Sequence, residues 1–167
     1  MPTLNYYIDL LSHMSVNKNK SKPAPHKAVL LLTIIDMIEV GEISSPFVQI
    51  SDSLIENFRK VWNSYVPRHS GYVQKITYPF IHLSSSPFWK LVKASSYQGQ
   101  TEYSGIKALK RDYSGAMIDA ELFQMLKDPF SRKEIRELLK YIYLGERGTS
   151  SSLIGITTII ALICTVA

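Results

Sequence analysis

A helix that begins with two basic side chains is the first candidate for chemistry in this sequence. The run "PHKAVLLLTIIDMIE" reads as an apolar helix whose first turn holds His26 and Lys27. The N-terminal end of a helix carries partial positive charge, so cations there are unfavourable, whereas phosphate is attracted to its free N–H groups. The two residues therefore predict an anion site, or a histidine that caps the loop beside a lysine that points to water. The helix alone does not decide between them.

The segment "TYPFIHL" is the second candidate. It places two aromatic rings and a proline among basic neighbours, and aromatic surfaces serve nucleic-acid binding. We expect Phe80 to pack in the core. Tyr78, Pro79 and His82 are expected at the surface, where they are available to a ligand.

Residues in a catalytic or metal-binding arrangement are not apparent. The acids are scattered along helix exteriors, and no glycine-rich phosphate loop or nucleophile elbow occurs. The lone Cys164 excludes an intramolecular disulfide. The four histidines lack metal-ligand spacing: His13, His26, His69 and His82. We therefore expect no cofactor, no metal and no enzymatic activity of the chain itself.

Positive charge is concentrated in the middle of the chain. The net charge is +5, and between Asn57 and Arg111 the only acid is Glu102. The basic residues in that window are Arg59, Lys60, Arg68, Lys75, Lys90, Lys93, Lys107, Lys110 and Arg111. A second basic group is Lys18, Lys20, Lys22 and Lys27. Such an acid-poor stretch favours a nucleic-acid partner, with a merely solvated basic face as the alternative.

Hydrophobic periodicity predicts a mainly helical α+β single domain with one small β-hairpin. Ser51 or Asp52 is expected to cap the third helix, Asp119 to cap the fifth and Ser131 to open the last. The proposed hairpin pairs 76–83 with 88–92, and Pro79 makes its first run an edge strand. The helices are expected at 3–15, 26–40, 52–65, 104–112, 119–128 and 131–144.

The last twenty residues differ from the rest. We expect a domain over 1–147 and, over 148–167, a serine- and threonine-rich linker with an apolar tail. The apolar run is shorter than the roughly 20 residues that cross a bilayer, so membrane insertion is not favoured. A tail anchor, a strand that docks on a partner and a non-native reading-frame end all remain open. With no signal-peptide pattern and one cysteine, a cytoplasmic protein is expected.

The ordered set of motifs resembles a known family. The segments are "PHKAVLLLTIIDMIE", a helix with Phe and Trp, "YPFIHLSSSPFWKL" and "AMIDAELFQMLKDPFSRKEIRELLKYIY". Together they span about residues 5–144 and resemble the sulfur-binding domain of type IV, modification-dependent restriction endonucleases. The resemblance implies a domain that binds double-stranded DNA carrying a phosphorothioate.

It also implies roles for individual residues. His26 and Lys27 would contact the DNA backbone at the modified phosphate. Tyr78 and Pro79 would build a shallow apolar pocket for the sulfur, with His82 where the family often has a small residue. A further basic residue would grip the phosphate or a base; its candidates are Lys107, Lys110 and Arg111.

The family usually continues into a nuclease domain, often of the His-Asn-His type, which this chain does not show. We therefore expect a domain that binds without cutting, or that acts through a nuclease domain or a partner subunit. Two alternatives remain: a general DNA-binding module without sulfur selectivity, and a protein-interaction or membrane-tethered adaptor that uses the apolar tail.

Overall fold

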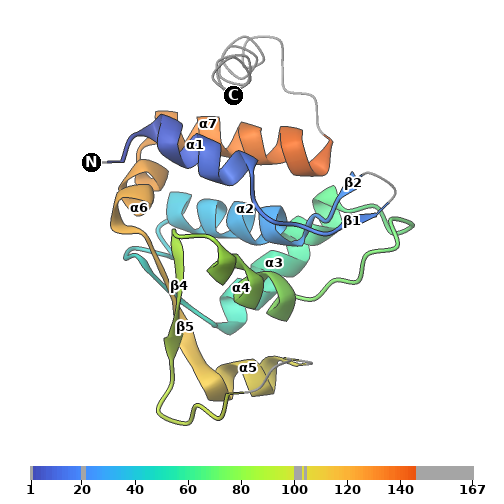
Figure 1. The fold of residues 1–167 in the computed structure, drawn as a ribbon, viewed down its shortest axis with the longest axis vertical. Coiled ribbons are helices and arrows are strands. Elements are labelled where there is room, and N and C mark those ends of the chain that lie inside the picture. Colours follow the sequence, from blue (N-terminus) through green and yellow to red (C-terminus); the bar gives the residue numbers. More distant parts are fainter. Residues whose placement is uncertain (1, 20–21, 100–102, 104, 146–167) are drawn as a thin grey trace.

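The computed structural model describes residues 2–19, 22–99, 103 and 105–145 as a mainly helical α+β domain (Figure 1). The predicted tail lies outside these residues. The helices are α1 (Leu4–Ser12), α2 (His26–Glu39), α3 (Asp52–Tyr65), α4 (Thr77–His82), α5 (Ile106–Asp112), α6 (Ala120–Lys127) and α7 (Pro129–Leu139). The strands are β1 (Lys18–Asn19), β2 (Lys22–Pro23), β3 (Phe47–Gln49), β4 (Trp89–Lys93) and β5 (Tyr113–Ile118). Two short helical turns, η1 (Leu83–Ser85) and η2 (Lys140–Leu144), follow α4 and α7.

The helix α2 is the centre of the core. Eleven of its 14 residues are buried, because the run from Ala28 to Ile35 is apolar on nearly every side. It packs against α3, α4, α6 and α7. In Figure 1, α1 and α7 lie side by side above α2. Gly41, at a φ of +79°, turns the chain after the helix. The predicted central helix is confirmed.

The sheet corrects the predicted hairpin. It has three antiparallel strands in the order β3-β5-β4, and β4 pairs with β5 rather than with 76–83. The stretch Thr77–His82 is the helix α4, where Pro79 stands in the first turn and its missing N–H costs no helical bond. Phe80 is fully buried, as expected, and its carbonyl accepts a hydrogen bond from Trp89 Nε1 at 2.8 Å.

The middle strand β5 is absent from the prediction. Position 115 in this strand has no room for a side chain. A Cβ on Gly115 would lie 2.4 Å from the Val48 carbonyl oxygen and 2.6 Å from the Phe47 ring. The close approach of β3 requires glycine, which weakens the strand signal in the sequence.

The structure confirms two of the three predicted helix starts. Ser51 Oγ accepts from Leu54 N at 3.0 Å, and Asp119 Oδ1 accepts from Glu121 N at 2.9 Å. The prediction for the last helix is wrong, because α7 begins at Pro129 with Asp128 as its cap. Proline suits the first helical position, so it opens this helix two residues before the expected start.

Tyr143, near the end of the described chain, is joined to the N-terminal segment. Its hydroxyl donates to the Leu11 carbonyl at 2.6 Å and accepts from Met14 N at 3.2 Å. None of the helices in the described ranges is long and apolar enough to cross a membrane.

Candidate nucleic-acid interface

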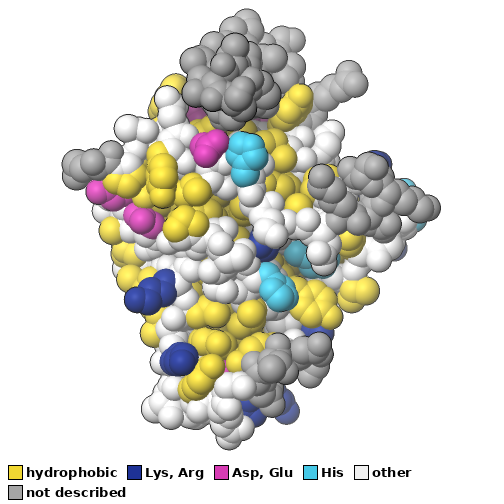
Figure 2. Space-filling model, in the orientation of Figure 1, with side chains coloured by type: hydrophobic (Ala, Val, Ile, Leu, Met, Phe, Trp, Pro, Cys, Tyr) yellow, Lys and Arg dark blue, Asp and Glu magenta, His cyan; other side chains and the backbone are white. Residues whose placement is uncertain are grey.

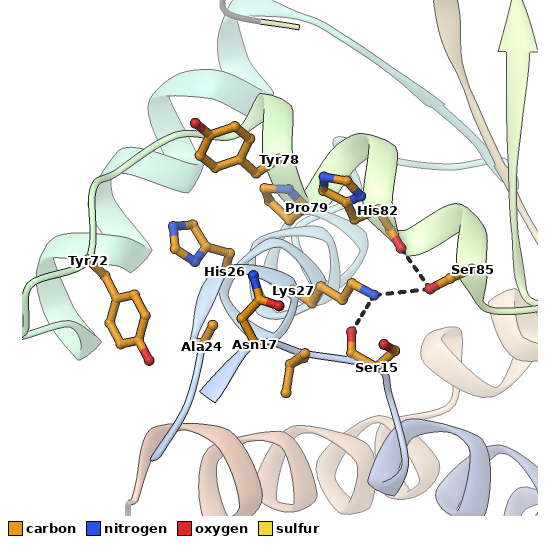
Figure 3. A pocket seen from close by; sticks show the side chains of 11 residues that line it. Ser15, Asn17, Ala24, His26, Lys27, Tyr72, Tyr78, Pro79, His82 and Ser85 are labelled. Atoms are coloured by element: carbon orange, nitrogen blue, oxygen red, sulfur yellow. Dashed lines mark hydrogen bonds between the residues drawn. The ribbon is translucent and has the colours of Figure 1, made fainter. Parts of the chain in front are cut away.

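A hollow of about 580 Å³ opens at the N-terminal end of α2 (Figure 3). We call it the phosphate pocket. It is surrounded by residues 15–17, Ala24, the start of α2, Tyr72, α4 and Ser85. Its lining residues include five of the eight predicted site residues: His26, Lys27, Tyr78, Pro79 and His82. Segments separated by some fifty residues in sequence thus meet at one place.

Lys27 is a buried cation at the bottom of this pocket. Its side chain is only 7% exposed, so the expectation of a lysine that points to water is wrong. Its Nζ donates to the Ser15 carbonyl at 2.7 Å and to Ser85 Oγ at 3.1 Å. Among the described residues, no carboxylate pairs with it. An ammonium has three N–H groups, so one remains for a ligand.

The burial of Lys27 has an electrostatic consequence. Burial lowers the pKa of its ammonium, since a desolvated charge without a counter-ion is unfavourable. An anion in the pocket would offset that cost. The start of α2 adds its unpaired backbone N–H groups and partial positive charge to the same place.

His26 has one ring nitrogen fixed. Its Nε2 lies 2.8 Å from the Val73 carbonyl oxygen, which can only accept, so Nε2 carries a proton. The other nitrogen, Nδ1, has no hydrogen-bond partner among the described residues and is the atom that gains or loses the second proton. Burial lowers the pKa of His26, and the bond to Val73 opposes this only in part.

Aromatic rings surround His26. Its ring centroid lies 4.7 Å from that of Trp62, 5.7 Å from Tyr72 and 6.2 Å from Tyr78. These contacts hold the imidazole in one orientation.

One wall of the phosphate pocket is formed by α4. Tyr78 is 45% exposed, and Lys75 Nζ lies 3.2 Å from its hydroxyl and 4.3 Å from its ring centroid. Pro79 lines the wall beside it but is buried, so its expected surface position is wrong. His82 is exposed, and its carbonyl accepts from Ser85 Oγ at 2.9 Å, so a chain of hydrogen bonds runs from α4 to Lys27 (Figure 3).

The other three predicted residues lie elsewhere. Lys107, Lys110 and Arg111 are on α5, beyond the sheet in Figure 1, and none lines the phosphate pocket. Lys110 Nζ lies 2.9 Å from Asp52 Oδ1, and Arg111 Nε lies 2.7 Å from Asp112 Oδ1. Their contact with DNA stays a prediction.

The surroundings of the pocket carry little negative charge. Figure 2 shows acidic side chains mainly in the upper half of the view, histidines from the upper half to the centre, and most Lys and Arg side chains in the lower half. Within the described part of the chain, no three His, Cys, Asp or Glu residues are placed to hold a metal ion. The arrangement suits an anionic ligand.

Sequence reasoning missed several contributors. Ser15 and Ser85 hold Lys27, the Val73 carbonyl fixes His26, and Tyr72 and Trp62 enclose it. Trp62 entered the sequence analysis only through the helix with Phe and Trp that supports the family resemblance. A backbone carbonyl carries no sequence signal, and isolated serines are too common to single out.

Comparison with known proteins agrees with this picture. The family model described as "ScoMcrA-like, DNA sulfur-binding domain" matches residues 5–153. The chain belongs to this family of DNA sulfur-binding domains. A solved structure described as "Sulfur binding domain of SprMcrA complexed with phosphorothioated DNA" is similar at a TM-score of 0.63 and 16% identity, covering 91% of this chain and 92% of that one. At that identity the likeness shows a shared sulfur-binding-domain fold. No curated protein matches the sequence.

Proposed function

We propose that this domain binds double-stranded DNA carrying a phosphorothioate, with the modified phosphate in the phosphate pocket. The observation that carries the proposal is the buried ammonium of Lys27, which has no carboxylate partner among the described residues and lines the same pocket as Tyr78 and Pro79. Family membership and a relative described as complexed with phosphorothioated DNA support the same ligand.

Three kinds of donor would hold the phosphate. Lys27 offers its third N–H, α2 offers its first backbone N–H groups, and His26 offers Nδ1 when protonated. The remaining Lys and Arg residues of the acid-poor region would add affinity that does not depend on sequence, because phosphate neutralisation releases counter-ions.

The wall formed by Tyr78 and Pro79 would select sulfur. A sulfur atom is larger, softer and less strongly hydrated than the oxygen it replaces. An anionic oxygen against apolar atoms loses its water without gaining a hydrogen bond, which is costly. Sulfur loses less and gains dispersion contacts with the two rings. Selectivity therefore arises mainly from a penalty on oxygen.

One observation favours a second candidate function. His82 lines the pocket with a polar ring where the family often has a small residue. That ring could donate to an ordinary phosphate oxygen and so lower the penalty on unmodified DNA. The second candidate is a DNA-binding module without sulfur selectivity.

The remaining parts of the proposal concern the whole protein. We place the DNA-binding unit within residues 1–147 and assign any cleavage to a nuclease domain or a partner subunit, as in the restriction endonucleases that the family serves. A cytoplasmic location fits a DNA ligand. An adaptor role would rest on the tail, which lies outside the described residues.

A gel shift with two duplexes of one sequence, with and without the phosphorothioate, at one salt concentration tests the proposal. We expect tighter binding of the modified duplex. Equal binding would favour the general DNA-binding module, and binding of neither would favour the adaptor.

A further inference from the structure

Two consecutive serines in the turn η1 make the same local hydrogen bond. Ser84 Oγ donates to the Ile81 carbonyl at 2.6 Å, and Ser85 Oγ donates to the His82 carbonyl at 2.9 Å. Both serines are exposed. Ser85 lines the phosphate pocket, whereas Ser84 does not. The two residues therefore differ mainly in what the pocket places beside them.

The partners of Ser85 determine the direction of its hydrogen bonds. The His82 carbonyl oxygen can only accept, so the hydroxyl proton of Ser85 is directed to it. The lone pairs of the same hydroxyl oxygen remain for Lys27, whose Nζ donates to it at 3.1 Å (Figure 3). Ser85 thus acts on the ammonium as an acceptor, and its single proton is already used.

Lys27 needs a second acceptor because its side chain is flexible. A lysine carries its ammonium on a four-carbon stem and has three rotatable N–H groups. The Ser15 carbonyl, at 2.7 Å from Nζ, would by itself leave the ammonium free to turn about that one bond. With Ser15 and Ser85 both in place, two N–H groups are used and the direction of the third is fixed.

A phosphate that binds the third N–H of Lys27 displaces neither serine. The contact with Ser85 is then present both in the free protein and in the complex, so its effect on affinity is to orient the ammonium before the ligand arrives. Immobilising a long side chain on binding is unfavourable, and orientation in advance removes that cost.

We propose that Ser85 is a positioning residue of the phosphate pocket, which orients the ammonium of Lys27 for the DNA phosphate and acts on affinity only through that ammonium. The inference rests on the proposed function and adds to it a residue that prepares the site. The competing role is purely structural: the bond to the His82 carbonyl would hold the end of α4, and with it the wall formed by Tyr78 and Pro79.

The two roles differ in their effect on selectivity. Affinities are measured by fluorescence anisotropy for two duplexes of one sequence, with and without the phosphorothioate. Ser85→Ala should weaken both duplexes by about fivefold, the cost of immobilising one long side chain, and should keep the ratio between them. A change confined to the modified duplex would mean that Ser85 supports the wall, and would overturn the proposal. Unaltered affinity for both duplexes would also overturn it.

Ser84→Ala is the matched control, because it removes the same local hydrogen bond one residue earlier and outside the pocket. It should change affinity by less than about twofold, as expected for a surface substitution. Ser85→Thr keeps the hydroxyl and should recover most of the affinity that Ser85→Ala loses. Thermal unfolding checks that each variant is folded. An equal loss in both alanine variants would mean that the turn as a whole is responsible, against the proposal.

A double-mutant cycle with Lys27→Met tests whether Ser85 acts through the ammonium. All four proteins are measured at one low salt concentration, where weak binding is still detected. In the Lys27→Met background, Ser85→Ala should have no further effect, because no ammonium is left to orient. A further loss of about fivefold there would show that Ser85 acts independently, and would overturn the proposal.

Tighter binding by Ser85→Ala alone would also overturn it, since the serine would then compete with the phosphate for Lys27. Equal binding of the two duplexes by the unsubstituted protein would refute the proposed sulfur selectivity but not the role of Ser85, because either duplex reports on the phosphate contact. Binding of neither duplex would refute both proposals.

Discussion

The two basic groups of this domain, at the start of α2 and on α5, contain the same kinds of side chain in opposite environments. Lys27 is buried and has no carboxylate partner in the described structure, whereas Lys110 and Arg111 each lie within 3 Å of an aspartate, Asp52 and Asp112 respectively. A charge that the protein has already neutralised gains little from a further anion. A count of basic residues therefore says less about a binding site than the presence or absence of a carboxylate beside each one.

Removal of the unpaired cation should have the largest effect. We expect Lys27→Met to weaken binding of both duplexes by at least about 100-fold, because a buried charge–phosphate contact is lost. The same change should raise the unfolding temperature of the free protein, since a desolvated charge is replaced by an apolar chain. Anisotropy and calorimetry measure the two effects.

The control for that variant is Lys133→Met, an exposed lysine on α7. It should change affinity by less than about threefold, as expected for one distant surface charge. Unaltered binding by Lys27→Met would show that the ammonium does not contact the DNA.

Substitution in the pocket wall should separate selectivity from affinity. We expect Pro79→Gly to reduce the preference for the modified duplex by about tenfold, mostly by weakening its binding, because sulfur loses an apolar contact. The comparison variant is Pro87→Gly, which alters an exposed proline outside the pocket. A preference that survives Pro79→Gly would place the sulfur elsewhere.

Binding should depend on pH through His26. Burial holds the pKa of the free imidazole below its ordinary value, while a phosphate beside Nδ1 favours the protonated form. The ring contacts Trp62, Tyr72 and Tyr78 and shares the phosphate pocket with Lys27 and His82, and none of these residues carries a carboxylate. Affinity should thus be highest below the pKa of free His26. It should fall by up to about tenfold per pH unit as pH rises toward the pKa of the complex.

Anisotropy between pH 5.5 and 8.5 at constant ionic strength measures this dependence. His26→Gln keeps a donor to the Val73 carbonyl but cannot be protonated, so its affinity should vary much less over that range. A matching pH profile in His82→Gln and in the unsubstituted protein assigns the effect to His26. Loss of the dependence in the His82 variant would contradict the assignment to His26.

The smallest effect is expected on α5. Lys107→Ala and Lys110→Ala should each weaken both duplexes by no more than about threefold, because neither lysine lines the phosphate pocket and Lys110 is already paired. Titrations at several salt concentrations provide the measurement. A tenfold loss of affinity would contradict this expectation, if the slope of log affinity against log salt also fell by about the amount for one phosphate contact. It would extend the DNA interface to α5 and weaken the contrast with α2.

Local signals were sufficient for the helices with clear ends. Ser51 and Gly41 mark where α3 begins and where α2 stops, and both act within a few residues. The hairpin prediction failed because β-rich composition in 76–83 was outweighed by packing: Phe80 is buried against the core, and its carbonyl is bonded by Trp89. Strand β5 was missed because the close approach of Phe47 and Val48 requires a glycine at position 115, and both residues are far away in sequence.

In the candidate site too, some residues could be predicted from the sequence, whereas contacts between distant residues could not. The resemblance named the five predicted residues that line the pocket, and the structure brings those side chains together. It could not give the partners of Lys27, because Ser15 and Ser85 are 12 and 58 residues away and neither type is distinctive. Nor could it give the Val73 carbonyl, which any residue at that position would supply.

The hydrogen bonds of Tyr143 link the end of the described chain to the phosphate pocket. Its hydroxyl bonds to Met14 N, and the next residue, Ser15, gives its carbonyl to Lys27. One peptide unit therefore connects the last turn of the described chain with the floor of the phosphate pocket. The hydrogen bonds of the Tyr143 hydroxyl to Leu11 and Met14 thus anchor the backbone that supplies the Ser15 carbonyl, so the C-terminal end of the described domain helps to fix the floor of the phosphate pocket.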